Sequence, residues 1–105
     1  MSTLAQLNLA AATNNDVYTV GGTASMTINI NLVNSGATAA TSVKIYVAAS
    51  GSPLASELVD DVYLSQPGVA VNANGFEHTG LAVSTGKHIV IVPDIAGVVA
   101  YIGGY

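Results

Sequence analysis

Turn-forming residues recur along this chain roughly every 8 to 12 positions, a spacing that leaves no stretch long enough for a helix of several turns. Gly and Asn supply the positive φ angles of tight turns, and Pro ends a strand because it cannot donate to the ladder. The chain is therefore expected to fold as short antiparallel strands. The turn signals are Thr13–Asp16, Gly21–Gly22, Asn34–Gly36, Ser50–Pro53, Gln66–Gly68, Asn72–Gly75, Ser84–Gly86 and Pro93–Asp94.

Between these turns the side chains alternate with the period of two that is typical of a strand with one buried face. Every second residue of Ser25–Leu32 is apolar, and Val43, Ile45 and Val47 repeat the pattern. We interpret Ser25 to Ala48 as a hairpin around Asn34–Thr41. A further alternating segment, Glu57–Leu64, changes phase at Asp60–Asp61, which predicts a bulge or a bend of the kind that edge strands carry.

The length of 105 residues is that of one domain, residues 1–105, with a core of two layers. Half of the residues are apolar and only eight are charged, which is unusual for a domain that stays alone in solution. The net charge of −4, with two Lys and no Arg, makes nucleic acid or an anionic membrane an improbable partner. Cysteine is absent, which suits a protein that is made in a reducing cytoplasm.

The N-terminal segment does not have the pattern of an export signal. It lacks a basic region, and Gln6 and Asn8 interrupt its apolar residues, so we interpret it as a first strand. The most apolar segment, from Ile89 to Ile102, is shorter than the roughly 20 residues of a membrane span and contains Pro93 and Gly97. We therefore expect no segment that crosses a membrane.

Two segments of the last third are apolar on both faces, His88–Val92 and Val98–Ile102. A sheet with one face in water should show polar residues on that face, so contact with another subunit is the simpler account. The alternative is a small closed barrel with a mildly apolar exterior. The candidate contact residues are Tyr46, Ile89, Val90, Ile91, Val92, Val98, Val99, Tyr101 and Ile102.

The residues that could carry chemistry form no strong motif. His78 and His88 with Glu77 permit a metal site, but no motif holds a third ligand in place. Asp60–Asp61 with Asp16, Glu57 or Asp94 lack the alternating oxygens of a calcium loop. No Gly-x-Ser-x-Gly elbow presents a nucleophile. We therefore expect no enzyme activity, no cofactor and no metal.

The five tyrosines could stack on sugars or anchor a protein interface. They are spread along the chain, which argues against one common platform, and Tyr46 and the segment from Tyr101 to Tyr105 are the candidates for contacts between chains. The five are Tyr18, Tyr46, Tyr63, Tyr101 and Tyr105.

The pattern of strands and turns resembles that of small β-sandwich virion proteins of tailed bacteriophages, such as capsid decoration (cement) proteins and fibre or tail modules. The resemblance lies in Leu4–Leu9 with Asp16–Val20, Met26–Leu32, Asn34–Val43 and Ala73–Leu81 before Gly86–Val90, and so covers nearly the whole chain. It implies a single antiparallel immunoglobulin-like β-sandwich of about seven to eight strands. It also implies symmetric assembly on a virion.

The function that follows from this resemblance is a non-enzymatic role in the virion, assembled in the host cytoplasm. We expect a decoration protein that binds the major capsid protein or other virion proteins, stabilises the shell and forms a homo-oligomer, with a trimer favoured. The chain has no fibrous repeat, which favours the capsid over a tail, neck or fibre position. The alternative is a carbohydrate-binding module for host adsorption that uses exposed Tyr and Asn side chains, Tyr46 among them.

Overall fold

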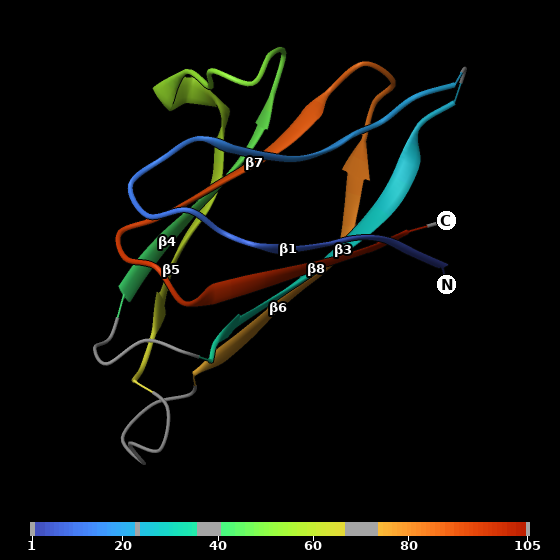
Figure 1. The fold of residues 1–105 in the computed structure, drawn as a ribbon. Helices are drawn as coiled ribbons and strands as arrows, with labels where there is room; N and C mark the ends of the chain where they lie inside the picture. The colour runs from blue at the N-terminus through green and yellow to red at the C-terminus, as the bar shows by residue number, and fades with distance from the viewer. Residues whose placement is uncertain (1, 23, 36–40, 67–73, 105) are drawn as a thin grey trace.

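Eight strands form two four-stranded sheets that pack face to face (Figure 1). The computed structural model describes residues 2–22, 24–35, 41–66 and 74–104. Parts of three predicted turns, at residues 36, 67–68 and 72–73, and Tyr105 lie outside the described residues. The strands are β1 (Ser2–Asn8), β2 (Asn15–Thr19), β3 (Met26–Asn34), β4 (Thr41–Ala48), β5 (Leu58–Leu64), β6 (Gly75–Val83), β7 (His88–Pro93) and β8 (Val98–Gly104), with a short 3₁₀ helix, Ala55–Glu57, before β5.

The strand order is β1-β8-β3-β6 in one sheet and β2-β7-β4-β5 in the other, and every pairing is antiparallel. We call them sheet A and sheet B. The pairs β1·β8, β2·β7, β3·β6 and β4·β5 form one long folded ribbon with β4 and β5 at its tip. The ribbon is rolled up so that β3 also pairs with β8 and β4 with β7.

This order is that of a jelly roll, an eight-stranded sandwich of two sheets. The prediction of an all-β antiparallel sandwich with seven to eight strands is confirmed. In an immunoglobulin domain, by contrast, strands that follow each other in sequence pair as neighbours within the ABED sheet. Here only β4 and β5 are consecutive and paired, so the sandwich has jelly-roll connections.

The predicted hairpin from Ser25 to Ala48 is wrong, because its two strands belong to different sheets. β3 pairs with β6 and β8, whereas β4 pairs with β5 and β7. Alternation tells which face of a strand is buried, but it does not tell which strand lies beside it. The connection after β3 therefore crosses from one sheet to the other, and residues 36–40 of it lie outside the described residues.

The core lies between the two sheets and is built from the inward positions of the four central strands. Ile30 on β3, Ile45 on β4, Ile91 on β7 and Ile102 on β8 are at most 1% exposed. Burying an aliphatic side chain of this size contributes about 1.5–3 kcal/mol relative to leaving it in water. Together with their inward neighbours, these residues give the described part of the chain one shared core.

Asn34 closes one end of the sandwich. It was predicted to be a turn residue, but it is the last residue of β3 and is completely buried. Its side-chain amide donates a hydrogen bond to the carbonyl of Ser65, just after β5, at 3.1 Å. This bond ties an end of sheet A to an end of sheet B.

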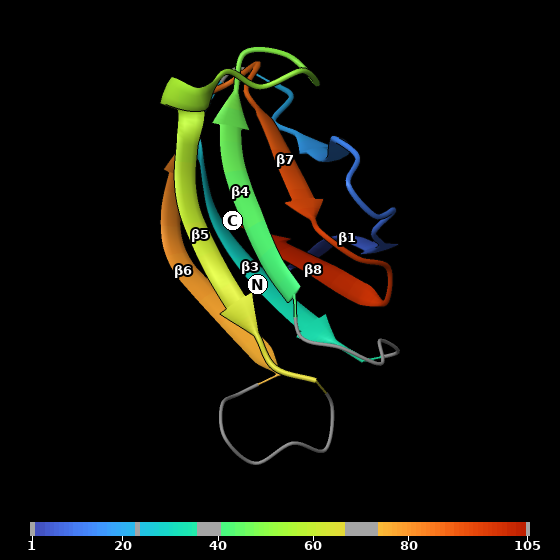
Figure 2. The ribbon, with the colours of Figure 1, turned by 90° about the vertical axis from the view of Figure 1, so that its left-hand side faces the viewer.

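The predicted irregularity and the predicted edge position of the segment after Glu57 are both confirmed, but the bulge lies at Val59, just before Asp60–Asp61. Ile45 pairs with Asp60 and Tyr46 with Leu58, so Val59 is an extra residue on β5. β5 is the last strand of sheet B, and it lies beside β6, the last strand of sheet A (Figure 2).

The core position of Ile30 gives a first prediction. Ile30→Ala should lower the free energy of unfolding by about 2–5 kcal/mol, because it leaves a cavity between β8 and β6. Leu54→Ala removes a comparable apolar group that is 65% exposed and should change stability by less than about 0.5 kcal/mol. Denaturant unfolding of both variants measures the difference. Equal losses would contradict this assignment of the core.

Candidate interaction surfaces

Most of the predicted contact residues lie inside the chain. Ile89, Val90, Ile91, Val98 and Ile102 are at most 1% exposed, so in this structure they are not available to a partner. Val92, Val99 and Tyr46 are half-buried, and Tyr101 is 38% exposed. The contact prediction therefore needs correction at the five buried positions.

The outward side of β7 is covered by the chain itself, and this explains why β7 is apolar on both faces. Val90 pairs with Tyr46 on one side and with Asp16 on the other, and all three lie on the outer face of sheet B. The loop after β4 reaches Asp16 across β7, since a Cβ placed on Gly51 would lie 3.2 Å from Asp16 Oδ2. The β4–β5 loop thus folds back over Val90, which needs no second subunit for its burial.

Glu57 holds this loop closed. Its carboxylate accepts hydrogen bonds from the backbone N–H of Leu54 at 2.8 Å and of Ala49 at 2.9 Å. These two bonds, the one from Leu54 first, lower the pKa of Glu57 from its ordinary value of 4.5, because they favour the charged form.

The two histidines lie on different sheets, so the hypothesis of a shared metal site finds no geometry to support it. His88 Nδ1 lies 2.7 Å from Asp16 Oδ2 and 3.0 Å from Thr19 Oγ1, on the outer face of sheet B. His78 Nδ1 lies 3.4 Å from Asp60 Oδ2, a contact between β6 and β5 that bridges the two sheets. Among the described residues, no three His, Asp or Glu side chains are grouped as metal ligands.

The acidic residues considered for calcium are likewise dispersed. Asp60 contacts His78, whereas Asp61 lies opposite Lys44 on the outer face. Asp16 contacts His88 and Glu57 holds the β4–β5 loop. Asp16, Glu57 and Asp60 thus serve three separate local contacts, and Asp94 follows β7, where its backbone N–H donates a hydrogen bond to the Ser42 carbonyl at 3.0 Å.

A group of exposed apolar side chains lies at the β5 edge, a position that was not among the predicted contact residues. Of the six large exposed hydrophobic residues in the described ranges, four belong to β5 or the turn before it: Leu54 is 65% exposed, Tyr63 60%, Leu58 41% and Val59 38%. We call these four residues the β5 edge group. The C-terminal strands β7 and β8 are more apolar than β5, but most of their apolar side chains are buried in the core.

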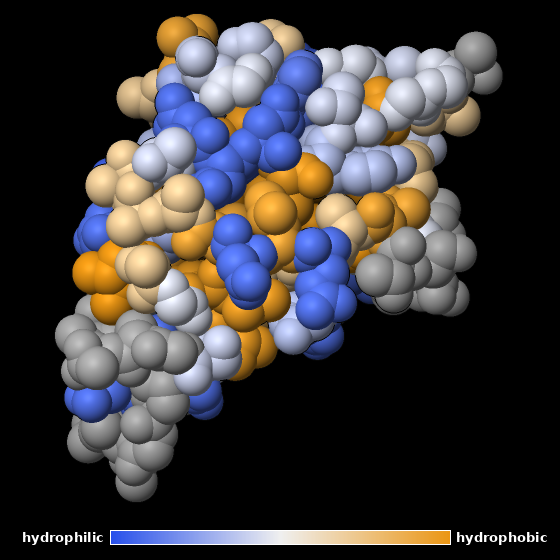
Figure 3. Space-filling view, viewed as in Figure 1, coloured by the Kyte–Doolittle hydropathy of each residue, from blue (hydrophilic) through white to orange (hydrophobic). Residues whose placement is uncertain are grey.

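A second apolar area lies on the opposite edge of the sandwich, where β1 runs beside β2 (Figure 3). Leu7 of β1, 39% exposed, is the large hydrophobic residue that reaches solvent there. Polar residues surround this area in the space-filling view. The sandwich thus exposes apolar side chains on two opposite edges.

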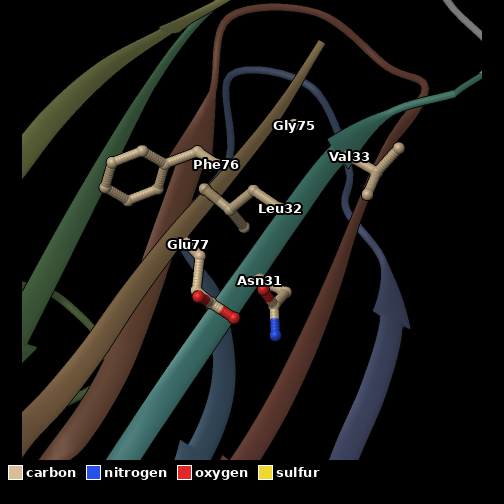
Figure 4. A pocket seen from close by; sticks show the side chains of 6 residues that line it. All are labelled: Asn31, Leu32, Val33, Gly75, Phe76 and Glu77. Carbon is tan, nitrogen blue, oxygen red and sulfur yellow. The ribbon is translucent and has the colours of Figure 1, made fainter. Parts of the chain in front are cut away.

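The outer face of sheet A has a shallow depression of about 380 Å³, lined by residues of β3 and β6. Asn31 and Glu77 lie side by side at one end of it, and Gly75 leaves the other end open (Figure 4). Asn31 also pairs with Tyr101 of β8, so the depression adjoins the most exposed aromatic ring of this sheet among the described residues.

No family model matches the chain, and neither a curated protein nor a solved structure shows a significant similarity to it. Within the described ranges, no helix has the length and apolarity needed to span a bilayer.

The hydrogen bonds of Glu57 give a second prediction. Because the folded state favours the charged carboxylate, the closed loop should be complete above pH 4.5 and should loosen as the pH falls through the lowered pKa of Glu57. The amide resonances of Ala49 and Leu54 should therefore titrate with a midpoint below 4.5. A midpoint at or above 4.5 would contradict the prediction that the hydrogen bonds to Glu57 lower its pKa.

Two variants test whether the β4–β5 loop depends on the Glu57 carboxylate in particular or on carboxylates in general. Glu57→Gln should increase amide hydrogen exchange at Ala49 and Leu54, because the neutral amide is a weaker acceptor. Glu77→Gln removes an exposed carboxylate on the other sheet and should leave both amides unchanged.

Proposed function

We propose that this protein is a non-enzymatic structural component of a virion, a capsid decoration protein that binds capsid subunits and stabilises the shell. The observation that carries the proposal is the β5 edge group, which gathers four exposed apolar side chains on one edge of a domain with only eight charged residues. Clusters of this kind on a soluble surface mark sites of contact with other proteins.

The fold supports the proposal by analogy. Jelly rolls occur in viral capsid and lectin domains, although a fold alone does not define a function. The resemblance to phage virion proteins points in the same direction. The major capsid protein and other virion proteins therefore remain the proposed partners.

The β5 edge favours contact through side chains rather than by addition of a strand. The bulge at Val59 interrupts the ladder, and Asp60 and Asp61 place two carboxylates on the same strand. Both features hinder pairing with a free strand of another chain. The apolar side chains around them stay accessible and can pack against a partner.

Two apolar surfaces on opposite edges suit a head-to-tail contact between copies. The β5 edge group of one copy can pack against the area around Leu7 of the next, and contacts of this type form a ring when the rotation between copies closes. A trimer is the ring that we favour. A tail or fibre module would use the same two apolar surfaces. Binding to purified capsids therefore distinguishes a decoration protein from such a module.

The β5 edge group gives a third prediction. Leu58→Asp should weaken binding to assembled capsids and self-association by at least about tenfold, since it removes an apolar contact and adds a third charge beside Asp60 and Asp61. The free energy of unfolding should change little, because Leu58 is 41% exposed. Co-sedimentation with capsids and light scattering across a dilution series measure both effects.

The matched control is Ala82→Asp, which adds the same charge at an exposed position of β6. It should bind and assemble like the unmodified protein. If Leu58→Asp binds capsids as well as this control, the β5 edge group is not the contact surface.

A further inference from the structure

We propose that the outer face of sheet A carries a binding site for a neutral or amino-sugar oligosaccharide. The site is a single row of four outward side chains, Gln6, Tyr101, Asn31 and Glu77, one from each strand of the sheet. This inference is independent of the β5 edge group, which lies on sheet B.

The strand registers place these four side chains in line. Gln6 pairs with Tyr101, Tyr101 with Asn31, and Asn31 with Glu77. Neighbouring strands are about 4.8 Å apart, so the row spans roughly 14 Å. That length fits a short oligosaccharide that lies across the strands.

The chemistry of the row matches what sugars offer. The ring of Tyr101 can pack against the C–H face of a pyranose, as aromatic rings do with apolar surfaces. The amides of Gln6 and Asn31 both donate and accept, and the carboxylate of Glu77 accepts, so neighbouring hydroxyls can be bound on either side of the ring.

These polar groups are free to bind a ligand. Among the residues that the structure describes, none of the four side chains takes part in a hydrogen bond or ion pair. Asn29, by comparison, is also on β3 and faces the same way, but its side-chain oxygen accepts a bond from the Gly80 amide at 2.8 Å. The row is thus distinct from polar residues that serve the sheet itself.

The platform under the row is rigid. Tyr101 and Asn31 lie on β8 and β3, the two central strands of sheet A. Their inward neighbours Ala100, Ile102, Ile30 and Leu32 are all at most 1% exposed. A site on such strands holds its side chains in place before the ligand arrives, which reduces the entropy lost on binding.

A glycine and a depression lie beside the row. Gly103 is the next outward position after Tyr101 on β8, so β8 itself adds no side chain on that side of the ring. On the other side of the row, Val33 and Gly75 line the depression of about 380 Å³ together with Asn31 and Glu77 (Figure 4). This shape suits a flat ligand that rests on the sheet.

The charge of the face defines the class of sugar. The only cationic side chains of the chain are Lys44 on β4 and Lys87 just before β7, both at sheet B. With Glu77 in the row and no Lys or Arg on sheet A, sulfated, phosphorylated or sialylated ligands are disfavoured. Neutral hexoses and amino sugars are the expected ligands.

The test is an NMR titration of the intact chain with neutral, amino-sugar and sialylated oligosaccharides, each up to millimolar concentration. We expect saturable shifts of Gln6, Asn31, Glu77 and Tyr101 with at least one neutral or amino-sugar ligand, and none with the sialylated one. Tyr101→Ala should weaken that binding by roughly tenfold or more. Its amide spectrum should otherwise remain that of the folded protein.

Tyr63→Ala is the matched control, because it removes a more exposed ring from sheet B. It should bind the sugar as the unmodified chain does. Equal losses in the two variants, shifts confined to other residues, or no shifts with any neutral or amino sugar would overturn the proposal. Broadening of the same four residues by capsid protein but not by sugars would instead identify this face as a protein interface.

Discussion

Pairing between the two ends of the chain is the constraint on which the rest of the structure depends. β8 lies between β1 and β3, and the register of β1 with β8 extends from Ser2↔Gly104 to Asn8↔Val99. One of the two central strands of sheet A is therefore the last of the eight strands in sequence order. Contacts between residues so far apart in sequence are slow to form, so the sandwich is expected to fold late and cooperatively. The row of Gln6, Asn31, Glu77 and Tyr101 exists only after this step.

The sequence was sufficient to predict the strands but not their partners. The period of two in Ser25–Leu32, the turn signals at Ser50–Pro53 and Ser84–Gly86, and the phase change beside Asp60–Asp61 are local signals, and they correspond to an observed strand, to observed connections between strands and to a bulge. Pairing of β3 with β6 and β8 is not local. A strand with one apolar face fits any neighbour that shares the core, so the hairpin between β3 and β4 was a natural but wrong choice.

The contact surface was harder to predict for a different reason. Ile89–Val92 were predicted to contact another subunit because the segment is apolar on both faces. In the structure, β7 is covered on both sides, by the core and by the β4–β5 loop. The exposed residues Leu54, Leu58 and Tyr63 do not form one apolar run, because Ser56–Glu57 and Asp60–Asp61 separate them. The signal that could have identified them is the predicted edge strand itself, since side chains on a bulged edge have fewer neighbours to cover them.

Three of the eight charged residues make internal contacts in the described part of the chain. Asp16 contacts His88, Asp60 contacts His78, and Glu57 closes the loop over β7. Lys44 lies opposite Asp61. The chain has only eight charged residues in all, so the apolar edges of two copies can approach each other at low electrostatic cost. Glu77 is the one Asp, Glu or Lys on the strands of sheet A, and it faces outward beside Asn31. In the sugar site that we propose, its carboxylate accepts hydrogen bonds from ligand hydroxyls.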